Sequence, residues 1–543
     1  MINLIKRFYS KYLIRLHRIQ DWQNSLDKIS HKKKFTKNKK KLKVLVGPSF
    51  SLWEHSSAFD RLLSTALEIR GCEIIPMYCN SIQKVECNCV GGDWVNNEFK
   101  INCKKCKFYS ERMWKPYKKS LIKLSSFVEE NKLRKSLDKS LNNLNLKSLI
   151  SYKKNKINYG ALAKDILVNN HLVSSISLVP NATNLLREHI KNLIILNASY
   201  LNIIKKLKPD RVITNDSSYG MWKLIEIICK EKSIPFYSHW PITKNRVVIA
   251  HNDAALNFNF KSSWKNFLKK KINKKDLNTI NTWLSGKRGT YASDKTNLEI
   301  NSKFDNIIQN IDIKKPTLLL AANVCWDVAA LNKQIIFSDM NEWIIETIKW
   351  FKLNSNYQLI IKPHPWENMK GLPLTNETVE TSILSKIKKI PDNVFLLKNN
   401  THISTNEIKN NFDIRGVTVH TTTVGLEYPA SGIFSITTAK APFRNCGFTY
   451  DPKTKDEYFK KIYQLLSKNR FLSDKKILLA KKFIKFYNFH YSTNLNLYDG
   501  SSVKLLKGFE NAINKKKGTL DYICKKIING KSINDENSWL PFT

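Results

Sequence analysis

The sequence has no run of 18 or more apolar residues, which excludes a conventional membrane-spanning helix because such a helix needs about 20. Its first residues, MINLIKRFYSKYLIRLHRIQ, lack the apolar core and the small-residue cleavage site of a secretory signal peptide. Glycine is also scarce: the loop that follows the first predicted strand has a single glycine and is no dinucleotide-binding fingerprint. We therefore expect a cytoplasmic protein.

Acidic residues are few, with 45 Asp and Glu against 91 Lys and Arg, and the formal net charge is +46. Such a balance can indicate nucleic-acid binding. Here Lys, Asn and Ile are abundant throughout the chain and no nucleic-acid-binding motif is present, so the charge indicates a general compositional bias. We expect no nucleic-acid partner.

Residues 1–43 form a basic segment that can be drawn as an amphipathic helix followed by HKKKFTKNKKKLK. Such a segment suits the anionic inner face of a plasma membrane, through its charge and shallow apolar burial. A solvated basic tail is the alternative interpretation.

Six of the ten cysteines lie between Cys72 and Cys106. Cytoplasmic location argues against structural disulfides. Two pairs, Cys87 with Cys89 and Cys103 with Cys106, are spaced so that four thiolates could hold one structural zinc ion. Free thiols in a loop are the alternative, and no cofactor is expected for catalysis.

At 543 residues the chain exceeds what one hydrophobic core usually serves, so we expect two main domains. From Lys43 onward an apolar strand, a Gly-Pro loop, an amphipathic helix and a second strand predict a β-loop-α-β unit. The pattern recurs at Arg211–Thr214. We assign residues 44–295 to an N-terminal Rossmann-like domain with a cysteine-rich insert.

A second series of strand and helix patterns begins at Pro316, and we assign residues 296–490 to a C-terminal Rossmann-like domain and 491–543 to a helical tail. Two successive sets of βα units predict an α/β fold, with two Rossmann-like domains facing each other across a cleft.

Two aspartates stand out as candidate catalytic groups. Asp216 follows the strand at 211–214, at the carboxyl end where open α/β sheets bind ligands. Asp327, in CWDVA, is the second. Either could act as a base or, if configuration is retained, as a nucleophile. Capping of the helix that follows is the alternative role for each.

The second half also offers an anion site. In YQLIIKPHPWEN an apolar strand ends in His364 between two prolines, which present the imidazole on a stiff turn. Thr422 and Thr423 precede a predicted helix whose N-terminus favours phosphate, and Glu427 in that helix could accept hydrogen bonds from ribose. Lys362 or Arg444 could supply charge. N-capping by threonine is the alternative.

Five segments, NVCWD, FSDMNEWI, IIKPHPWE, TVGLEYPASG and FRNCGFTYDPKTKDEYF, resemble the motifs of capsule polysaccharide biosynthesis proteins, a group that includes capsule Kdo (3-deoxy-manno-octulosonic acid) transferases. The resemblance is densest over residues 315–460. It implies a glycosyltransferase-B-like architecture, with the acceptor on the N-terminal side and a nucleotide sugar on the C-terminal domain. It also implies that His364 and Pro365 contact donor phosphate, and that Thr423, Gly425 and Glu427 hold phosphate and ribose. Tyr428 departs from the small residue expected there.

The function expected from the resemblance is transfer of a sugar from a nucleotide donor to a lipid-linked or oligosaccharide acceptor in surface polysaccharide biosynthesis. A sugar-nucleotide epimerase of the same architecture is one alternative, and a non-catalytic assembly or export factor is another. The donor base, the sugar and the linkage cannot be read from the sequence.

Overall fold

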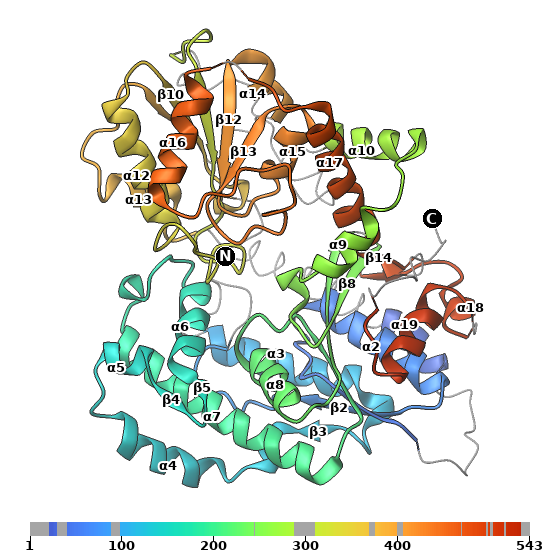
Figure 1. Ribbon diagram of the computed structural model, residues 1–543. Helices are drawn as coiled ribbons and strands as arrows, with labels where there is room; N and C mark the ends of the chain where they lie inside the picture. The colour runs from blue at the N-terminus through green and yellow to red at the C-terminus, as the bar shows by residue number, and fades with distance from the viewer. Residues whose placement is uncertain are drawn as a thin grey trace, which may run out of the picture.

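The computed structural model shows two lobes, each built around a sheet (Figure 1). It describes residues 21–29, 41–87, 98–243, 245–286, 310–368, 375–398, 405–468, 470–495, 498–499, 503–514 and 517–533. No helix among these residues is long and apolar enough to span a bilayer. The predicted helix within residues 1–20 lies outside the described chain.

The first lobe contains a seven-stranded sheet in the order β14-β8-β7-β6-β1-β2-β3. Strands β1, β2, β3, β6 and β7 run parallel, and β8 and β14 add an antiparallel edge. The bounds are Lys43–Val46 (β1), Glu73–Tyr78 (β2), Ile122–Lys123 (β3), Arg211–Asn215 (β6), Phe236–Thr243 (β7), Arg246–His251 (β8) and Thr493–Asn494 (β14). Since β2 and β6 lie on opposite sides of β1, the strand order reverses between β1 and β6.

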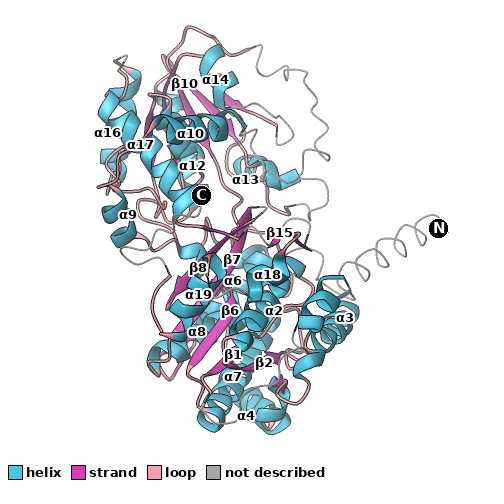
Figure 2. Cartoon of the chain, turned by 90° about the vertical axis from the view of Figure 1, so that its right-hand side faces the viewer, coloured by secondary structure: helices cyan, strands magenta, loops and turns pink. Residues whose placement is uncertain are grey.

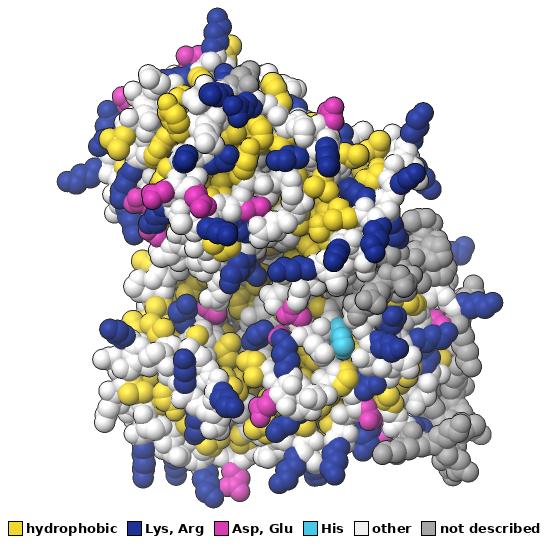
Figure 3. Space-filling view, in the orientation of Figure 1, with side chains coloured by type: hydrophobic (Ala, Val, Ile, Leu, Met, Phe, Trp, Pro, Cys, Tyr) yellow, Lys and Arg dark blue, Asp and Glu magenta, His cyan; other side chains and the backbone are white. Residues whose placement is uncertain are grey.

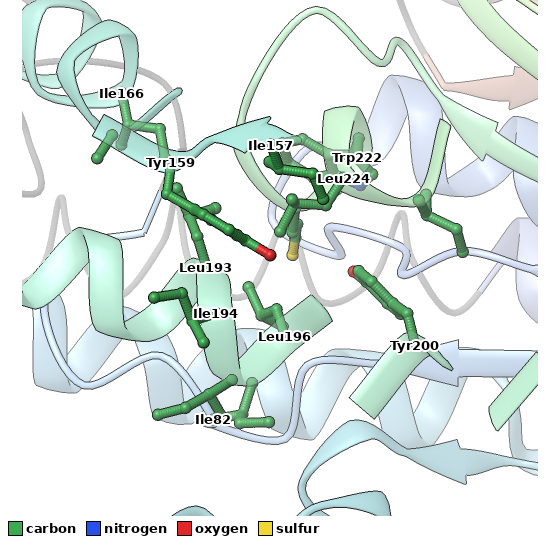
Figure 4. Close-up of a cluster of buried hydrophobic side chains, with 14 of the residues drawn as sticks. Ile82, Ile157, Tyr159, Ile166, Leu193, Ile194, Leu196, Tyr200, Trp222 and Leu224 are labelled. Carbon is green, nitrogen blue, oxygen red and sulfur yellow. The ribbon is translucent and has the colours of Figure 1, made fainter. Parts of the chain in front are cut away.

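The longest helix among the described residues, α7 (Ala182–Leu207), organises the core of this lobe. Its buried residues face Tyr159 of α6, and Trp222 and Leu224 of α8 (Figure 4). The other elements here are α2 (Glu54–Ile69), α3 (Glu98–Met113), α4 (Glu130–Leu141), α5 (Leu146–Ile150), α6 (Tyr159–Asn170), α8 (Gly220–Glu231), the β4–β5 hairpin (Lys153–Lys154, Ile157–Asn158), and the short helices η1 (Lys115–Tyr117), η2 (Leu124–Phe127), η3 (Ile176–Leu178) and η4 (Ala255–Asn257).

The second lobe contains a fully parallel sheet in the order β11-β10-β9-β12-β13. Its strands are β9 (Thr317–Ala321), β10 (Gln358–Lys362), β11 (Val394–Leu396), β12 (Ile414–Val419) and β13 (Phe434–Thr437). All five residues of β9, TLLLA, are buried, as expected for a strand covered on both faces. The prediction of an α/β fold with two Rossmann-like domains is confirmed.

Helices cover both faces of this second sheet (Figure 2). They are α12 (Met340–Leu353), α13 (Val379–Leu384), α14 (Thr405–Asn411), α15 (Val424–Ala430), α16 (Lys455–Leu466) and α17 (Asp474–Lys485), with η5 (Pro365–Asn368) after β10 and the π-helical turn η6 (Phe486–His490) after α17.

The chain crosses between the lobes in ways that the predicted boundaries do not include. Helices α9 (Lys261–Phe267) and α10 (Lys274–Gly286) pack on the second lobe, where Trp264 lies 5.0 Å from Phe483 between ring centroids. The predicted boundary at residue 295 falls outside the described residues.

Beyond residue 490 the chain returns to the first lobe. Strand β14 joins its sheet, the hairpin of β15 (Tyr498–Asp499) and β16 (Lys504–Leu505) follows, and α18 (Phe509–Asn514) and α19 (Thr519–Ile528) pack on α2. A buried ion pair of 2.9 Å joins Arg70 to Asp521. Residues 21–29 form a helix whose Asp27 pairs with Arg61. The tail is therefore part of the first domain.

The buried hydroxyl of Tyr458 on α16 holds the second sheet to its helices. It lies 2.9 Å from Trp343 Nε1 and 3.0 Å from Thr347 Oγ1 on α12, and 3.2 Å from Thr418 Oγ1 on β12. The network therefore holds β12 in position against α12 and α16. This matters for the candidate site because β12 leads directly into it.

We expect Tyr458→Phe to lower the free energy of unfolding by roughly 1–3 kcal/mol, because it leaves the buried indole N–H of Trp343 without its acceptor. Tyr463→Phe on the exposed face of the same helix should change it by less than about 0.5 kcal/mol. Urea unfolding measures both. Equal, small effects of the two variants would show that the network contributes nothing to stability.

Candidate active site

The two sheets each have one point at which strand order reverses, and ligands of open α/β sheets bind there, beyond the carboxyl ends of the strands. In the first sheet this point lies between β1 and β6, and in the second between β9 and β12. Asp216 follows β6 directly, and Asp327 lies in the loop after β9. Sequence reasoning thus chose an aspartate near each reversal.

Asp216 is buried and held by backbone donors. Its Oδ2 accepts from Ser218 N at 3.0 Å and its Oδ1 from Leu256 N at 2.9 Å. Burial raises the pKa of this carboxyl, and the two backbone hydrogen bonds only partly oppose the rise. Tyr219 occupies the N-cap position of α8, so Asp216 does not cap that helix.

Asp327 begins a turn that is fixed from several sides. Its Oδ1 accepts from Val328 N at 2.7 Å, and its carbonyl oxygen accepts from the amides of Ala330 and Leu331. Burial, together with the nearby charge of Asp216, raises the pKa of Asp327 to about 6, and the hydrogen bond from Val328 opposes this rise. A carboxyl of this kind can exchange a proton near neutral pH.

The turn that carries Asp327 is anchored to the end of β12. Thr421 Oγ1 donates to the carbonyl of Ala329 at 2.5 Å, and Thr421 N donates to Asn323 Oδ1 at 3.1 Å. His420 Nε2 lies 3.4 Å from the carbonyl of Ala330, and burial lowers the pKa of His420 to about 4. A neutral imidazole therefore supports the turn at physiological pH.

Asp216 and Asp327 come from different lobes and sense each other's charge. Between the lobes the molecular surface is indented (Figure 3). The hydroxyl of Tyr219 is buried without a described hydrogen-bond partner, and its pKa is raised well above the usual value by burial and then by Asp327, Asp165 and Asp216. The raised pKa keeps this phenol protonated, so its hydroxyl can donate a hydrogen bond to a ligand in the site.

One lysine lies among these acids. Burial lowers the pKa of Lys333, while the charges of Asp216, Asp253 and Asp327 raise it and that of Lys440 lowers it. Lys333 is positioned by its backbone, since its carbonyl accepts from Lys440 N at 2.8 Å. Acidic and basic groups thus share one interdomain site.

The second lobe carries the predicted donor-binding groups along one edge of its sheet. Lys362 on β10 and Val419 on β12 both pair with Ala321 of the central strand β9. Lys362 and Val419 therefore lie at the same level of the sheet, two strand spacings or about 10 Å apart, and His364 and Thr421 each follow two residues later. Groups at this separation can contact a single nucleotide.

The imidazole of His364 has a defined tautomer. Its Nδ1 accepts from Trp366 N at 3.2 Å, so the ring proton lies on Nε2. Pro365 opens η5, and within that turn Glu367 N donates to the His364 carbonyl at 3.1 Å. Burial raises the pKa of Glu367 to about 8, and its Oε1 accepts from Val379 N. The prolines and this short helix hold the histidine.

The threonine segment opens α15, which is only seven residues long and contains Pro429. Thr422 and Thr423 are half-buried there, and the Thr423 hydroxyl donates to Glu427 Oε1 at 3.2 Å. Gly425 has a packing reason to be glycine: a Cβ would lie 2.6 Å from the ring of Phe443 and 2.7 Å from Val419 Cγ2. Whether these residues hold phosphate and ribose stays a prediction.

Arg444 lies at the same sheet edge but is engaged locally. Its Nη1 donates to the carbonyl and to the hydroxyl oxygen of Thr437, at 2.7 and 2.8 Å, and its Nη2 donates to the carbonyl of Pro452. This arrangement favours a structural role for Arg444, which leaves Lys362 and Lys333 as better placed cations.

The cysteine prediction is met only in part by the described residues. Cys87, Cys103 and Cys106 line one pocket together with Cys79, whereas Cys89 lies outside the described residues. No three His, Cys, Asp or Glu side chains within the described ranges form a ready-made metal site. The prediction of structural zinc therefore stays open.

Sequence reasoning missed Tyr219, Lys333, Asp165 and Asp253. Only Tyr219 could have been found from the local sequence, because it stands three residues after Asp216 in the same loop. Lys333 is one of many lysines, and Asp165 lies within a helix. Only the approach of the two lobes brings these groups together.

No family model matches the chain and no curated protein matches it. Among solved structures, the β-Kdo 2,4 transferase KpsC of Thermosulfurimonas dismutans is 12% identical, with 59% of this chain and 95% of that chain covered and a TM-score of 0.33. A putative UDP-N-acetylglucosamine 2-epimerase of Listeria monocytogenes is 12% identical, over 86% and 94% of the two chains, with a TM-score of 0.26.

The glycosyltransferase SnogD of Streptomyces nogalater is 9% identical, with 82% of this chain and 96% of that chain covered and a TM-score of 0.22. Similarities this low carry no argument about the chemistry of the present chain.

We expect Asp327→Asn to stabilise the protein above pH 6 and to change little at pH 4. The folded-state pKa of about 6 lies above the ordinary 3.8, so the native state binds the proton more tightly and loses stability as pH rises through this window. The amide removes this loss, a gain of about 1–3 kcal/mol at pH 8, and its oxygen can still accept from Val328.

Denaturant unfolding at pH 4 and pH 8 measures the effect, with Asp392→Asn at an exposed position as the control. Identical pH dependence in the wild type and Asp327→Asn would contradict the raised pKa.

Proposed function

We propose that the protein is a nucleotide-sugar-dependent glycosyltransferase of bacterial surface polysaccharide biosynthesis. The observation that carries the proposal is the meeting of Asp216 and Asp327, one from near each sheet's reversal point, in the interdomain site. Paired carboxyl groups with raised pKa values in a site between two domains are typical of acid–base chemistry. The motif resemblance of the second half supplies the substrate class.

In this proposal the bond between the anomeric carbon and the donor phosphate breaks while the acceptor hydroxyl attacks the sugar. The hydroxyl must lose its proton, and the departing phosphate must be stabilised. Asp327, whose pKa is about 6, would receive the proton. Asp216 would face the positive charge that develops on the sugar ring, and Tyr219 would donate a hydrogen bond to a sugar oxygen.

The departing phosphate would lie at the edge of the second sheet. His364 would donate from Nε2, the nitrogen that carries its proton, and Lys362, Lys333 and the hydroxyls of Thr422 and Thr423 would complete the anion site. Glu427 would accept from ribose. The sugar would then point from the second lobe toward the aspartates.

The finer assignments rest on the resemblance. They are Kdo as the sugar and a lipid-linked or oligosaccharide acceptor on the first lobe. Peripheral contact with an anionic membrane is proposed separately, from the charge and amphipathic pattern of residues 1–43. The lysines and arginines of the face in Figure 3 are scattered over both lobes and form no single basic patch on that face.

We expect one of CMP, UDP, GDP and dTDP to raise the melting temperature of the protein, since a ligand that binds only the folded state stabilises it by mass action. His364→Ala should abolish this shift and leave basal melting nearly unchanged. Lys389→Ala, at an exposed site, should keep the shift. A collapse of basal melting in His364→Ala would make the histidine structural.

We expect Asp327→Asn to reduce transfer of labelled sugar to an acceptor by about 10²-fold or more, while the nucleotide shift is retained. Turnover is followed with a labelled nucleotide sugar and a lipid or oligosaccharide acceptor. Conversion of the donor without any acceptor would select an epimerase. Donor binding with neither reaction would select a non-catalytic assembly factor, and unchanged transfer by Asp327→Asn would remove Asp327 from the chemistry.

A further inference from the structure

We propose that Cys79, Cys87, Cys103 and Cys106 form the binding site of one soft divalent metal ion, with Zn²⁺ as the physiological candidate. All four line a single pocket of about 30 Å³ in the first lobe. The ligand set differs from the one that spacing suggests, because Cys79, from the end of β2, takes the place of Cys89.

The four thiols converge from three separate parts of the chain. Cys79 follows β2 directly, Cys87 lies in the loop beyond it, and Cys103 and Cys106 are one turn apart on the same side of α3. The rest of the lining is mostly apolar or neutral and includes Phe50, Phe99 and Met221. Four sulfur ligands in such surroundings suit zinc, which prefers tetrahedral thiolate sites.

Donor groups already point at the sulfur atoms. Gln83 Nε2 donates to Cys79 Sγ at 3.9 Å, and the backbone N–H of Ser51 is directed at Cys106. Hydrogen bonds to sulfur favour the thiolate form and orient metal ligands. Buried free cysteines that serve only as small apolar residues need no such donors.

A further donor near the pocket lacks an acceptor in the described structure. The hydroxyl of Tyr200 is fully buried, has no hydrogen-bond partner among the described residues and lies near enough to Cys79 to sense its charge. A neutral thiol is a weak acceptor, whereas a metal-bound thiolate is a strong one. Metal binding would therefore satisfy this phenol, whose isolation otherwise costs free energy.

The sulfur atoms surround the pocket without yet standing at metal-binding spacing, as the described residues contain no ready-made site. Binding must therefore draw α3 and the Cys87 loop toward the end of β2. The ion would link α3 to the end of β2, the strand beside β1, whose following loop already contacts α3 through Ser51 Oγ, 2.7 Å from Ser110 Oγ. It would thus brace the reversal point of the first sheet.

The test uses full-length protein, reduced and freed of metal with a chelator, and titrated anaerobically with Co²⁺ as a spectroscopic substitute for Zn²⁺. We expect one equivalent per chain to produce a sulfur-to-cobalt charge-transfer band that Zn²⁺ abolishes. Because zinc binds thiolates and a free thiol must lose its proton to become one, binding should also release protons into a weakly buffered solution.

Variants define the ligand set. Cys79→Ser and Cys106→Ser should lose the band or weaken binding at least about tenfold, whereas Cys89→Ser should keep it. Cys229→Ser, at a buried free thiol on α8 outside the pocket, is the matched control and should bind like the wild type. Tyr200→Phe should weaken binding without changing the stoichiometry.

If a serine variant fails to fold, alkylation of the wild type decides: Zn²⁺ should protect Cys79, Cys87, Cys103 and Cys106 and leave the alkylation rate of Cys446, outside the pocket, unchanged. No band and no protection in the wild type would overturn the proposal and leave four packing thiols. A band that survives in Cys79→Ser and disappears in Cys89→Ser would overturn it in favour of the ligand set predicted by spacing.

Discussion

The arrangement of the whole site depends on hydrogen bonds that cross between the lobes at the end of α6. Asn169 Nδ2 donates to the carbonyl of Trp326, the residue before Asp327, at 3.2 Å. Asn332 Nδ2 donates to Asp165 Oδ2 at 2.7 Å, and Ser174 N donates to Glu377 Oε2 at 2.6 Å. These contacts hold the turn of one lobe against a helix of the other. Without them Asp216 and Asp327 would belong to two separate half-sites, and the charge of Asp216 would no longer raise the pKa of Asp327.

Holding two aspartates together has a cost, because buried like charges repel and lose their hydration. Asp216 offsets part of that cost with two backbone N–H donors, whereas Asp327 has one described side-chain hydrogen bond and a pKa of about 6. The asymmetry suits the roles proposed for them: Asp327 would exchange a proton near neutrality, and Asp216, held by two backbone N–H donors, would face the sugar ring. A fold selected only for stability would replace one of the pair by an amide or an apolar residue. The presence of both carboxyl groups in one buried site is therefore better explained by chemistry than by packing.

How much of this could be predicted from the sequence depends on the range of the interactions involved. Apolar runs ending in polar loops predicted the parallel strands and the sheet edge that carries His364 and Thr423, because strand burial and turn chemistry are local properties. Contacts between residues far apart in the sequence could not be predicted. The return of α19 to α2 depends on an ion pair between Arg70 and Asp521, 451 positions apart. The local contacts of Arg444 were equally unpredictable. Its guanidinium donates to the carbonyls of Thr437 and Pro452, and backbone carbonyls leave no trace in a sequence.

The distribution of charge would determine how a nucleotide sugar is oriented in the site. The chain has twice as many basic as acidic residues, and yet Asp165, Asp216, Asp253 and Asp327 all act on the groups of one interdomain site. If those aspartates were ordinary solvated or capping residues, nothing would favour their convergence from four separate segments. A basic protein attracts an anionic nucleotide sugar over a distance, and the acids then repel its phosphates locally. In the proposed function the anion would thereby be directed to His364 and Lys362 at the edge of the second sheet, and the sugar would face the carboxylates. The same field that captures the donor would thus orient it.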